Sequence, residues 1–297
     1  MSLHLPLKWH GGKGAHNGKL AKWILSLIQL PSNACYVEPY FGGGSVLLHN
    51  QHYDGIAEVV SDKSKSLVTF WRVLREQLPA LQQRLTLTPF AEDSLEQALD
   101  LIDLMAAADV PLDLGQQVEV AASLFVAVRQ SRQALMKDFA TQSTRLRGGM
   151  GESVSAYLSA IEGLGPVAQR LRRVTILNSD ALEVIRKYDS PTTVFYLDPP
   201  YLHETRSDRD SYAHEMTAEQ HEALLTRLQT IEGSFYLSGY ASSMYEYYAR
   251  RNGWKAHIMS VPLHSSSSST KATKLEHLWT NFPRTEYTGP SKVVRIS

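Results

Sequence analysis

The sequence has little of several features that define large classes of proteins. It contains one cysteine, Cys35, which excludes an intramolecular disulfide framework and a cysteine-rich zinc site. Its 30 Lys and Arg residues balance 30 Asp and Glu residues, which excludes a uniformly basic nucleic-acid coat. The longest apolar run, Val118 to Val128, is interrupted by Glu119 and Ser123 and is too short to span a bilayer. The first 15 residues show no secretory signal, so we expect a cytoplasmic protein that does not contact membranes.

What the sequence does contain is an alternation of strand-like and helix-like segments towards both ends. The 297 residues, 43% of them hydrophobic, suffice for a buried core and suggest about two domains. Short apolar strands, at 35–37, 56–60, 174–177, 194–197 and 235–237, alternate with segments of helical periodicity. This pattern is typical of an α/β fold that binds ligands at the carboxyl edge of its sheet. The alternation stops between about 79 and 170. We therefore predict a catalytic domain of residues 1–78 and 171–297, with a mostly helical insertion of residues 79–170.

The balanced total charge conceals two blocks of opposite sign. Residues 85–128 carry eight acidic residues and no Lys or Arg, whereas residues 129–175 carry eight basic residues against three acidic ones. A charged block is usually a solvated surface. A basic block next to a catalytic domain is also a candidate for binding phosphates.

A glycine turn follows the first predicted strand, in the segment Glu38-Pro-Tyr-Phe-Gly-Gly-Gly44. Glycines at such a turn let the backbone approach a ligand closely, and an acid next to them is typical of nucleotide sites. The alternative is a tight connection that binds nothing, because short glycine motifs are weak evidence. Asp62 follows the next strand, 24 residues after Glu38, where a ribose hydroxyl pair would be held. It could equally cap the helix that follows.

A third motif, Asp198-Pro-Pro-Tyr201, directly follows the apolar strand Thr193–Leu197. The two prolines stiffen the turn and remove two backbone donors. The remaining groups, the Asp198 carboxylate and the backbone carbonyls, accept hydrogen bonds, and Tyr201 adds an aromatic ring. These groups suit an exocyclic amino group on a flat base. The alternative is a rigid exit from the strand.

Together these motifs, with Leu7-Lys-Trp-His-Gly-Gly-Lys13 and Asn178-Ser-Asp180, resemble the Dam-type N6-adenine DNA methyltransferases. The order of the motifs is similar to the alpha group of that family, and phage and prophage members look most similar. The resemblance covers about 1–75 and 174–282. It implies a Rossmann-like S-adenosylmethionine-dependent methyltransferase sheet with an inserted target-recognition domain. It also implies that Asp198, Pro199, Pro200 and Tyr201 act on the flipped-out adenine.

The same resemblance implies the residues that bind S-adenosylmethionine. Trp9 and Lys13 would contact it, Asp62 would hold the ribose hydroxyls, Asp180 would lie near the cofactor adenine, and Asp198 would border cofactor and base. The residues implied in the glycine turn are Glu38, Pro39, Phe41, Gly42 and Gly44. No metal is expected, because the sequence has no cysteine–histidine ligand set.

DNA contacts are expected mainly in the basic part of the insertion, where Gly148-Gly149 could turn a hairpin into a groove. A solvated basic face is the alternative. The candidates are Arg132, Lys137, Arg145 and Arg147, with Arg206 and Arg209 after the tetrapeptide as a second pair.

The interpretation as an adenine methyltransferase has alternatives. The tetrapeptide also suits cytosine N4 in DNA, adenine in RNA or glutamine in a protein, and a DNA-binding relative could have lost turnover. Double-stranded DNA is the expected partner, and a cognate restriction endonuclease is a candidate partner. The sequence leaves the oligomeric state and the target site open.

Overall fold

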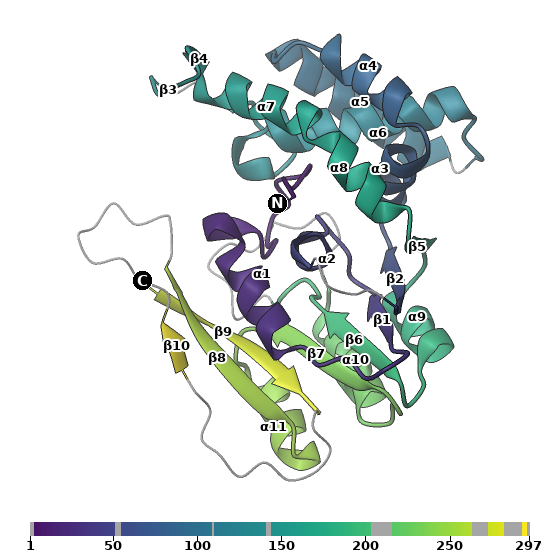
Figure 1. Cartoon of the computed structure of the whole chain (residues 1–297), viewed down its shortest axis with the longest axis vertical. Coiled ribbons are helices and arrows are strands. Elements are labelled where there is room, and N and C mark those ends of the chain that lie inside the picture. The colour runs from purple at the N-terminus through teal and green to yellow at the C-terminus, as the bar shows by residue number, and fades with distance from the viewer. Residues whose placement is uncertain are drawn as a thin grey trace. The chain divides into compact units, whose positions relative to one another are not determined.

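The computed structural model describes residues 3–50, 55–108, 110–140, 144–202, 216–262, 273–281 and 293–295. The chain forms two compact units (Figure 1). The first consists of Met1–Leu25, Phe41–Tyr53 and Ser61–Ser179, and the second of Ser26–Tyr40, Asp54–Val60 and Asp180–Ser297.

The main sheet is mixed, and its central strands are parallel. Among the described residues its strand order is β10-β8-β9-β7-β6-β1-β2-β5. Strand β1 pairs in parallel with β2 and β6, and β6 with β7, whereas β9 is antiparallel to both β7 and β8. The strands are β1 (Cys35–Glu38), β2 (Ala57–Asp62), β5 (Val174–Asn178), β6 (Thr193–Leu197), β7 (Ser234–Gly239), β8 (Lys255–Pro262), β9 (Thr273–Thr280) and β10 (Val293–Arg295). This architecture confirms the predicted α/β class, and β8 and β9 add an antiparallel hairpin to the sheet.

The core of the second unit lies around β6, in which every residue from Thr193 to Leu197 is buried. An uninterrupted apolar strand of this kind is expected where both faces of a parallel sheet are covered. The helices of this unit are α9 (Ala181–Tyr188), α10 (Ala218–Leu228) and α11 (Ser243–Asn252). Helix α10 begins with a capping box of Thr217 and Gln220, and α11 runs from the Ser242 cap to Gly253.

The first unit is mostly helical (Figure 1). Its helices are α1 (Ala15–Leu27), of which the last two residues belong to the second unit, α2 (Ser45–His49), α3 (Lys65–Glu76), α4 (Leu78–Thr86), α5 (Glu92–Ala108), α6 (Leu114–Gln130), α7 (Glu152–Glu162) and α8 (Leu164–Leu171). Helix α6 is buried almost all round and packs against α3, α4 and α5. Rings of Phe70, Trp71, Phe125 and Tyr157 fill the space between these helices.

Residues 79–170 lie entirely in the first unit. The described residues of this range belong mostly to α4–α8, with the 3-10 turn Arg132–Ala134 and one small hairpin between α6 and α7. On α5 the apolar Leu95 is buried and the acidic residues are exposed, as the periodicity predicts. No helix in the described part of the chain has the length and apolar content needed to cross a membrane.

Candidate active site

Two predicted site segments leave neighbouring parallel strands at the same edge of the second unit. Strand β1 ends at Glu38 and pairs in register with β6, Val37 opposite Phe195, and β6 ends directly before Asp198. Glu38 is only 2% exposed, and its Oε1 accepts a hydrogen bond of 2.7 Å from the Tyr36 hydroxyl. Pro39 is buried behind it. The carboxyl ends of parallel strands are where open α/β sheets bind their ligands.

The tetrapeptide that follows β6 is held tightly. Asp198 and Pro200 are half-buried, and Pro199 and Tyr201 are buried. The Tyr201 hydroxyl donates to Glu276 of β9, and the Tyr201 ring meets Tyr240 edge-on, with centroids 4.7 Å apart. On the strand itself, the Tyr196 hydroxyl lies 3.1 Å from the Ser238 hydroxyl of β7. The sheet edge therefore presents a fixed carboxylate inside an aromatic surround.

Burial and nearby carboxylates raise the pKa values of two tyrosines at this edge. Burial raises the pKa of Tyr196 well above its ordinary value, and the carboxylate of Asp198 raises it further. Burial raises the pKa of Tyr201 in the same way, with the charges of Glu276 and Asp198 adding to the effect. Both phenols therefore stay protonated at neutral pH, and the Tyr201 hydroxyl donates to Glu276.

The glycine turn belongs to the first unit from Phe41 onwards. Gly42 and Gly44 have φ angles of 51° and 67°, in the left-handed region that glycine adopts most easily. The turn closes through a 2.9 Å bond from the Gly44 amide to the Phe41 carbonyl. Trp9 packs directly on it, since a Cβ on Gly43 would lie 2.5 Å from the Trp9 Cβ. The structure thus brings the N-terminal motif and the glycine turn together.

Lys13 is 4% exposed, and its Nζ donates to the Gly11 carbonyl at 3.2 Å. Lys13 is thus a buried polar side chain at the end of the N-terminal motif, within the first unit.

Asp62 lies at the end of β2 and braces the glycine turn. Its Oδ2 accepts a hydrogen bond from the Gly42 amide at 2.9 Å, and its Oδ1 accepts one from the Ser64 amide at 3.0 Å. The alternative that Asp62 caps the next helix is wrong. Helix α3 begins at Lys65, and Ser64 is its cap, because the Ser64 side chain accepts from the Leu67 amide. Asp62 is two residues too early to reach that turn.

Asp180 does cap a helix. Its Oδ1 accepts a hydrogen bond of 2.9 Å from the Leu182 amide at the start of α9. The residue is exposed, so the cap leaves carboxylate surface accessible.

The basic residues of the insertion fall on two exposed features of the first unit. Arg132 and Lys137 are exposed on a tight loop closed by backbone bonds from Arg132 to Asp138, at 2.7 Å, and from Ala140 to Gln130, at 2.8 Å. Arg145 precedes, and Arg147 lies in, a hairpin of β3 (Leu146–Arg147) and β4 (Met150–Gly151). Its turn is Gly148-Gly149, both with positive φ, which confirms the predicted hairpin. Arg206 and Arg209 lie outside the described residues.

The sequence analysis missed the roles of two residues. Arg129, counted in the basic segment, donates from its guanidinium to the carbonyls of Leu5 and Pro6, the latter at 2.6 Å. It therefore ties α6 to the chain just before the N-terminal motif. Glu276, seen only as part of a resembling C-terminal segment, binds Tyr201 of the tetrapeptide. No local pattern marks either contact, because both join residues far apart in sequence.

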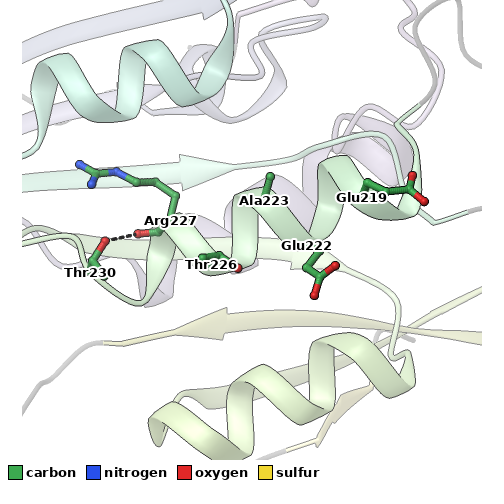
Figure 2. A pocket seen from close by; sticks show the side chains of 6 residues that line it. All are labelled: Glu219, Glu222, Ala223, Thr226, Arg227 and Thr230. Carbon is green, nitrogen blue, oxygen red and sulfur yellow. Dashed lines mark hydrogen bonds between the residues drawn. The ribbon is translucent and has the colours of Figure 1, made fainter.

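A shallow pocket among the described residues lies elsewhere, on α10. It is lined by Glu219, Glu222, Ala223, Thr226, Arg227 and Thr230 (Figure 2). None of the predicted catalytic or cofactor-binding residues borders it. Its lining comes from one helix and the residue two positions beyond it, and we assign it no role in catalysis.

Comparison with known proteins identifies the family. Residues 9–262 match the model of the D12 class N6 adenine-specific DNA methyltransferases. The chain belongs to this family. The match spans the N-terminal motif, the glycine turn, the insertion and the tetrapeptide, and it favours adenine in DNA over the other amino groups considered above. The description of the family names adenine in DNA as the group that its members methylate.

No curated protein matches the sequence. Among solved structures, a mutant of DNMT2 from Spodoptera frugiperda is similar at 9% identity and a TM-score of 0.28, over 45% of this chain and 44% of that one. The chain thus spans less than half the length of that protein. A proposed RNA methyltransferase from Pyrococcus horikoshii is similar at 13% identity and a TM-score of 0.23, over 69% of this chain and 96% of that one.

The residues present fit the methyl donor in character. S-adenosylmethionine offers ribose hydroxyls to a carboxylate and a cationic sulfonium to negative charge. The D12 class chain has a glycine turn with no side chains at three consecutive positions, the carboxylate of Asp62 next to it, and buried carboxylate at the sheet edge. Trp9 and Phe41 add apolar surface at the turn.

Proposed function

We propose that the Asp198–Tyr201 tetrapeptide of this adenine-N6 DNA methyltransferase grips the target adenine, and that the N-terminal motif and the glycine turn hold the methyl donor. The observation that supports this most is the register of β1 and β6. It places Glu38 and Asp198 at the ends of paired parallel strands. In open α/β sheets that edge is the ligand-binding edge.

The chemistry follows from the acceptors at the turn. The exocyclic nitrogen of adenine is a poor nucleophile, because its lone pair is delocalised into the ring. The Asp198 carboxylate and the Pro199 carbonyl each accept a hydrogen bond from that amino group, which makes its lone pair more available. S-adenosylmethionine supplies an electrophilic methyl group when bound. The amino nitrogen must also be held in line with that methyl group, and we assign this role to the stiff Pro-Pro turn.

We assign the cofactor roles residue by residue. Trp9 and Lys13 contact S-adenosylmethionine, as do Phe41, Gly42 and Gly44 of the glycine turn, and Asp62 holds the ribose. Glu38, Pro39 and Asp198 are further proposed contacts, and Asp180 lies near the adenine moiety. The turned-out target base would stack on an aromatic ring, with Tyr201 as the proposed platform.

DNA would be read by the insertion, residues 79–170, which we propose as the target-recognition domain, with 1–78 and 171–297 as the catalytic domain. Arg132 and Lys137 on the loop, and Arg145 and Arg147 at the hairpin, are exposed and basic. A two-stranded hairpin fits the width of a major groove. Arg206 and Arg209 form the second candidate pair.

The decisive test is single-turnover methylation by Asp198→Ala and Asp198→Asn. Loss of one preorganised electrostatic group costs about 10²–10³ in rate. Both variants should lose turnover to this extent and bind DNA nearly as tightly as the wild type. Methylation within a few-fold of the wild type would refute the role of Asp198.

The biological setting is a separate proposal. A cytoplasmic, phage-like enzyme with a cognate restriction endonuclease would protect its own sites from cleavage. Sequencing that detects N6-methyladenine in DNA from expressing cells gives the methylated sequence. Digestion of that DNA with endonucleases of the same specificity then tests protection.

A further inference from the structure

The contact between Tyr201 and Glu276 joins the tetrapeptide to a strand two positions away in the sheet. Tyr201 follows β6, Glu276 lies on β9, and β7 lies between these strands. Both residues are buried, with exposed fractions of 7% and 4%. The contact therefore crosses β7 inside the second unit and is shielded from water.

The register of the sheet explains how the two residues meet. Ser238 of β7 pairs with Leu278 of β9, and alternate residues of a strand share a face, so Glu276 lies on the same face as Ser238. Tyr196 of β6 reaches that face as well, through its hydroxyl contact with Ser238. Glu276 thus lies on the face of the sheet that Ser238 and Tyr196 share, and from there it reaches Tyr201 of the tetrapeptide.

The contact has a defined donor and acceptor. Burial, with the charges of Glu276 and Asp198, keeps the pKa of Tyr201 well above its ordinary value. The phenol therefore donates, and the Glu276 carboxylate accepts. A buried carboxylate needs such hydrogen bonds, because its desolvation is costly.

Strand β9 contacts the tetrapeptide region at a second point. The Tyr201 ring meets Tyr240 edge-on, at an interplanar angle of 81°, and the Lys274 ammonium lies 4.7 Å from the centroid of the Tyr240 ring. Lys274 is two residues before Glu276, on the same face of β9. One strand thus holds the hydroxyl end of Tyr201 directly and its ring through Tyr240.

We propose that Glu276 is a positioning residue for methyl transfer: it fixes the ring of Tyr201, and with it the Pro-Pro turn that aims Asp198. The proposal rests on the proposed function, in which this tetrapeptide grips the adenine. Glu276 does not touch the substrate. Its effect reaches the reaction through Tyr201, so it should alter the rate of transfer more than the binding of either substrate.

The test uses Tyr201→Phe, Glu276→Gln and the double variant in the full-length enzyme. Phe keeps the ring and removes the hydroxyl, and Gln keeps the shape and removes the charge. The substrate is unmethylated duplex DNA that carries the target sequence mapped with the wild type. Tyr201→Phe should lose about ten- to a hundredfold in single-turnover rate, the range for one hydrogen bond to a charged group. Glu276→Gln keeps a neutral acceptor oxygen and should lose less than Tyr201→Phe, but more than the control. The KM for S-adenosylmethionine should stay within about threefold, because this bond acts on orientation and not on binding.

The double variant separates one shared contact from two independent effects. If both residues act through the same bond, the double variant should be no slower than the slower single variant. Tyr248→Phe is the matched control. It removes a phenol that is 8% exposed and bonded to Thr226 at 2.9 Å, away from the tetrapeptide, and should leave the rate unchanged.

Rates within twofold of the wild type for Tyr201→Phe would overturn the proposal, and Phe should fold because it fits the same space. The proposal would also be overturned if the rate losses of the two single variants multiplied in the double variant. A higher KM for S-adenosylmethionine with an unchanged rate would overturn it as well. Asp198→Ala distinguishes this failure from that of the proposed function. If Asp198→Ala is inactive while Tyr201→Phe is fully active, the tetrapeptide is catalytic and Glu276 does not position it.

Discussion

The Asp62 carboxylate accepts a hydrogen bond from the Gly42 backbone amide at 2.9 Å, across twenty residues of chain. The acid expected to bind a ribose therefore also shapes the turn expected to hold the rest of the cofactor. Its other oxygen accepts from the Ser64 amide at the start of α3. The Asp62 side chain thus links the glycine turn to the residue before α3 within the first unit.

Asp62→Ala should weaken the binding of S-adenosylmethionine and lower the melting temperature of the free enzyme. The substitution leaves the amides of Gly42 and Ser64 without this acceptor, and each buried unsatisfied amide costs about 1–3 kcal/mol. Asp62→Asn keeps one acceptor oxygen and should fall between Ala and the wild type. Titration calorimetry and thermal melting measure both effects.

The wild type provides the reference for that experiment. At about 100 times its dissociation constant, S-adenosylmethionine should add about 2.7 kcal/mol to the free energy of unfolding. An Asp62→Ala variant with wild-type affinity and melting would contradict both roles of this carboxylate.

Gly43→Ala should damage cofactor binding through Trp9. The new Cβ would lie 2.5 Å from the Trp9 Cβ, so the N-terminal motif or the turn must move, at a cost of about 1–3 kcal/mol for overpacking. Gly165→Ala in α8 is the matched control, since a Cβ there meets no atom within 4 Å. We expect a higher dissociation constant for S-adenosylmethionine in the first variant only. Equal affinities in the two variants would exclude the Trp9 contact as a determinant of binding.

Arg129→Met should raise the dissociation constant for S-adenosylmethionine about tenfold and leave the rate at saturation unchanged. Burial lowers the pKa of Arg129 to about 10, so at neutral pH it is still charged and binds the carbonyls of Leu5 and Pro6. Met keeps the apolar stem but removes bonds worth about 1.5–3 kcal/mol each. The N-terminal motif that follows is then held less firmly against the glycine turn.

A matched control for this prediction is Arg84→Met, which removes a 2.9 Å ion pair with Glu119 inside the helical part of the same unit. It should leave cofactor affinity unchanged. If the two variants lose affinity equally, the effect of Arg129 is one of general stability, and the anchoring role is refuted.

The basic residues of the insertion should separate into two kinds when each is changed to Ala. Loss of a phosphate contact weakens binding to all DNA and makes the salt slope shallower by about one unit. Loss of a base contact costs about 1–3 kcal/mol on the methylated sequence alone. Salt titrations of DNA binding measure both for Arg132, Lys137, Arg145 and Arg147.

Arg250→Ala serves as the control for these four variants. Arg250 is also strongly exposed, with 78% of its side chain accessible, but it lies on α11 of the second unit. It should change neither affinity nor slope. If the four insertion variants behave like Arg250→Ala, the basic segment is only a solvated surface.

The fold could be predicted where one local pattern determines one element. The apolar run before Asp198 is the buried strand β6, and the Ser242 and Gly253 signals bound α11. Helix α6 has a local signal only at its start, where Asp113 and Gln116 form a capping box, because its residues from Val118 to Val128 are buried on nearly every side. A helix surrounded by other helices has no polar face, so the periodicity that marks helices is absent.

The candidate site was predictable to the same degree. Asp198 and the glycine turn are marked by their own neighbours in sequence. The contacts of Arg129 with Pro6 and of Glu276 with Tyr201 span 123 and 75 residues, and only the packed chain brings these groups together. Charge counting put Arg129 in a basic segment expected to contact DNA, because a count carries no information on which backbone carbonyls lie within reach.

The single thiol of the chain is chemically quiet. Cys35 lies on the central strand β1, half-buried, with partners on both sides at Ala57 and Thr193, and burial raises its pKa. Little thiolate is present at neutral pH, so maleimides and similar reagents react with it slowly. A cysteine introduced at the exposed hairpin, as in Leu146→Cys, would react first. A fluorophore can thus be attached to a cysteine introduced at the proposed DNA-reading hairpin without first removing Cys35.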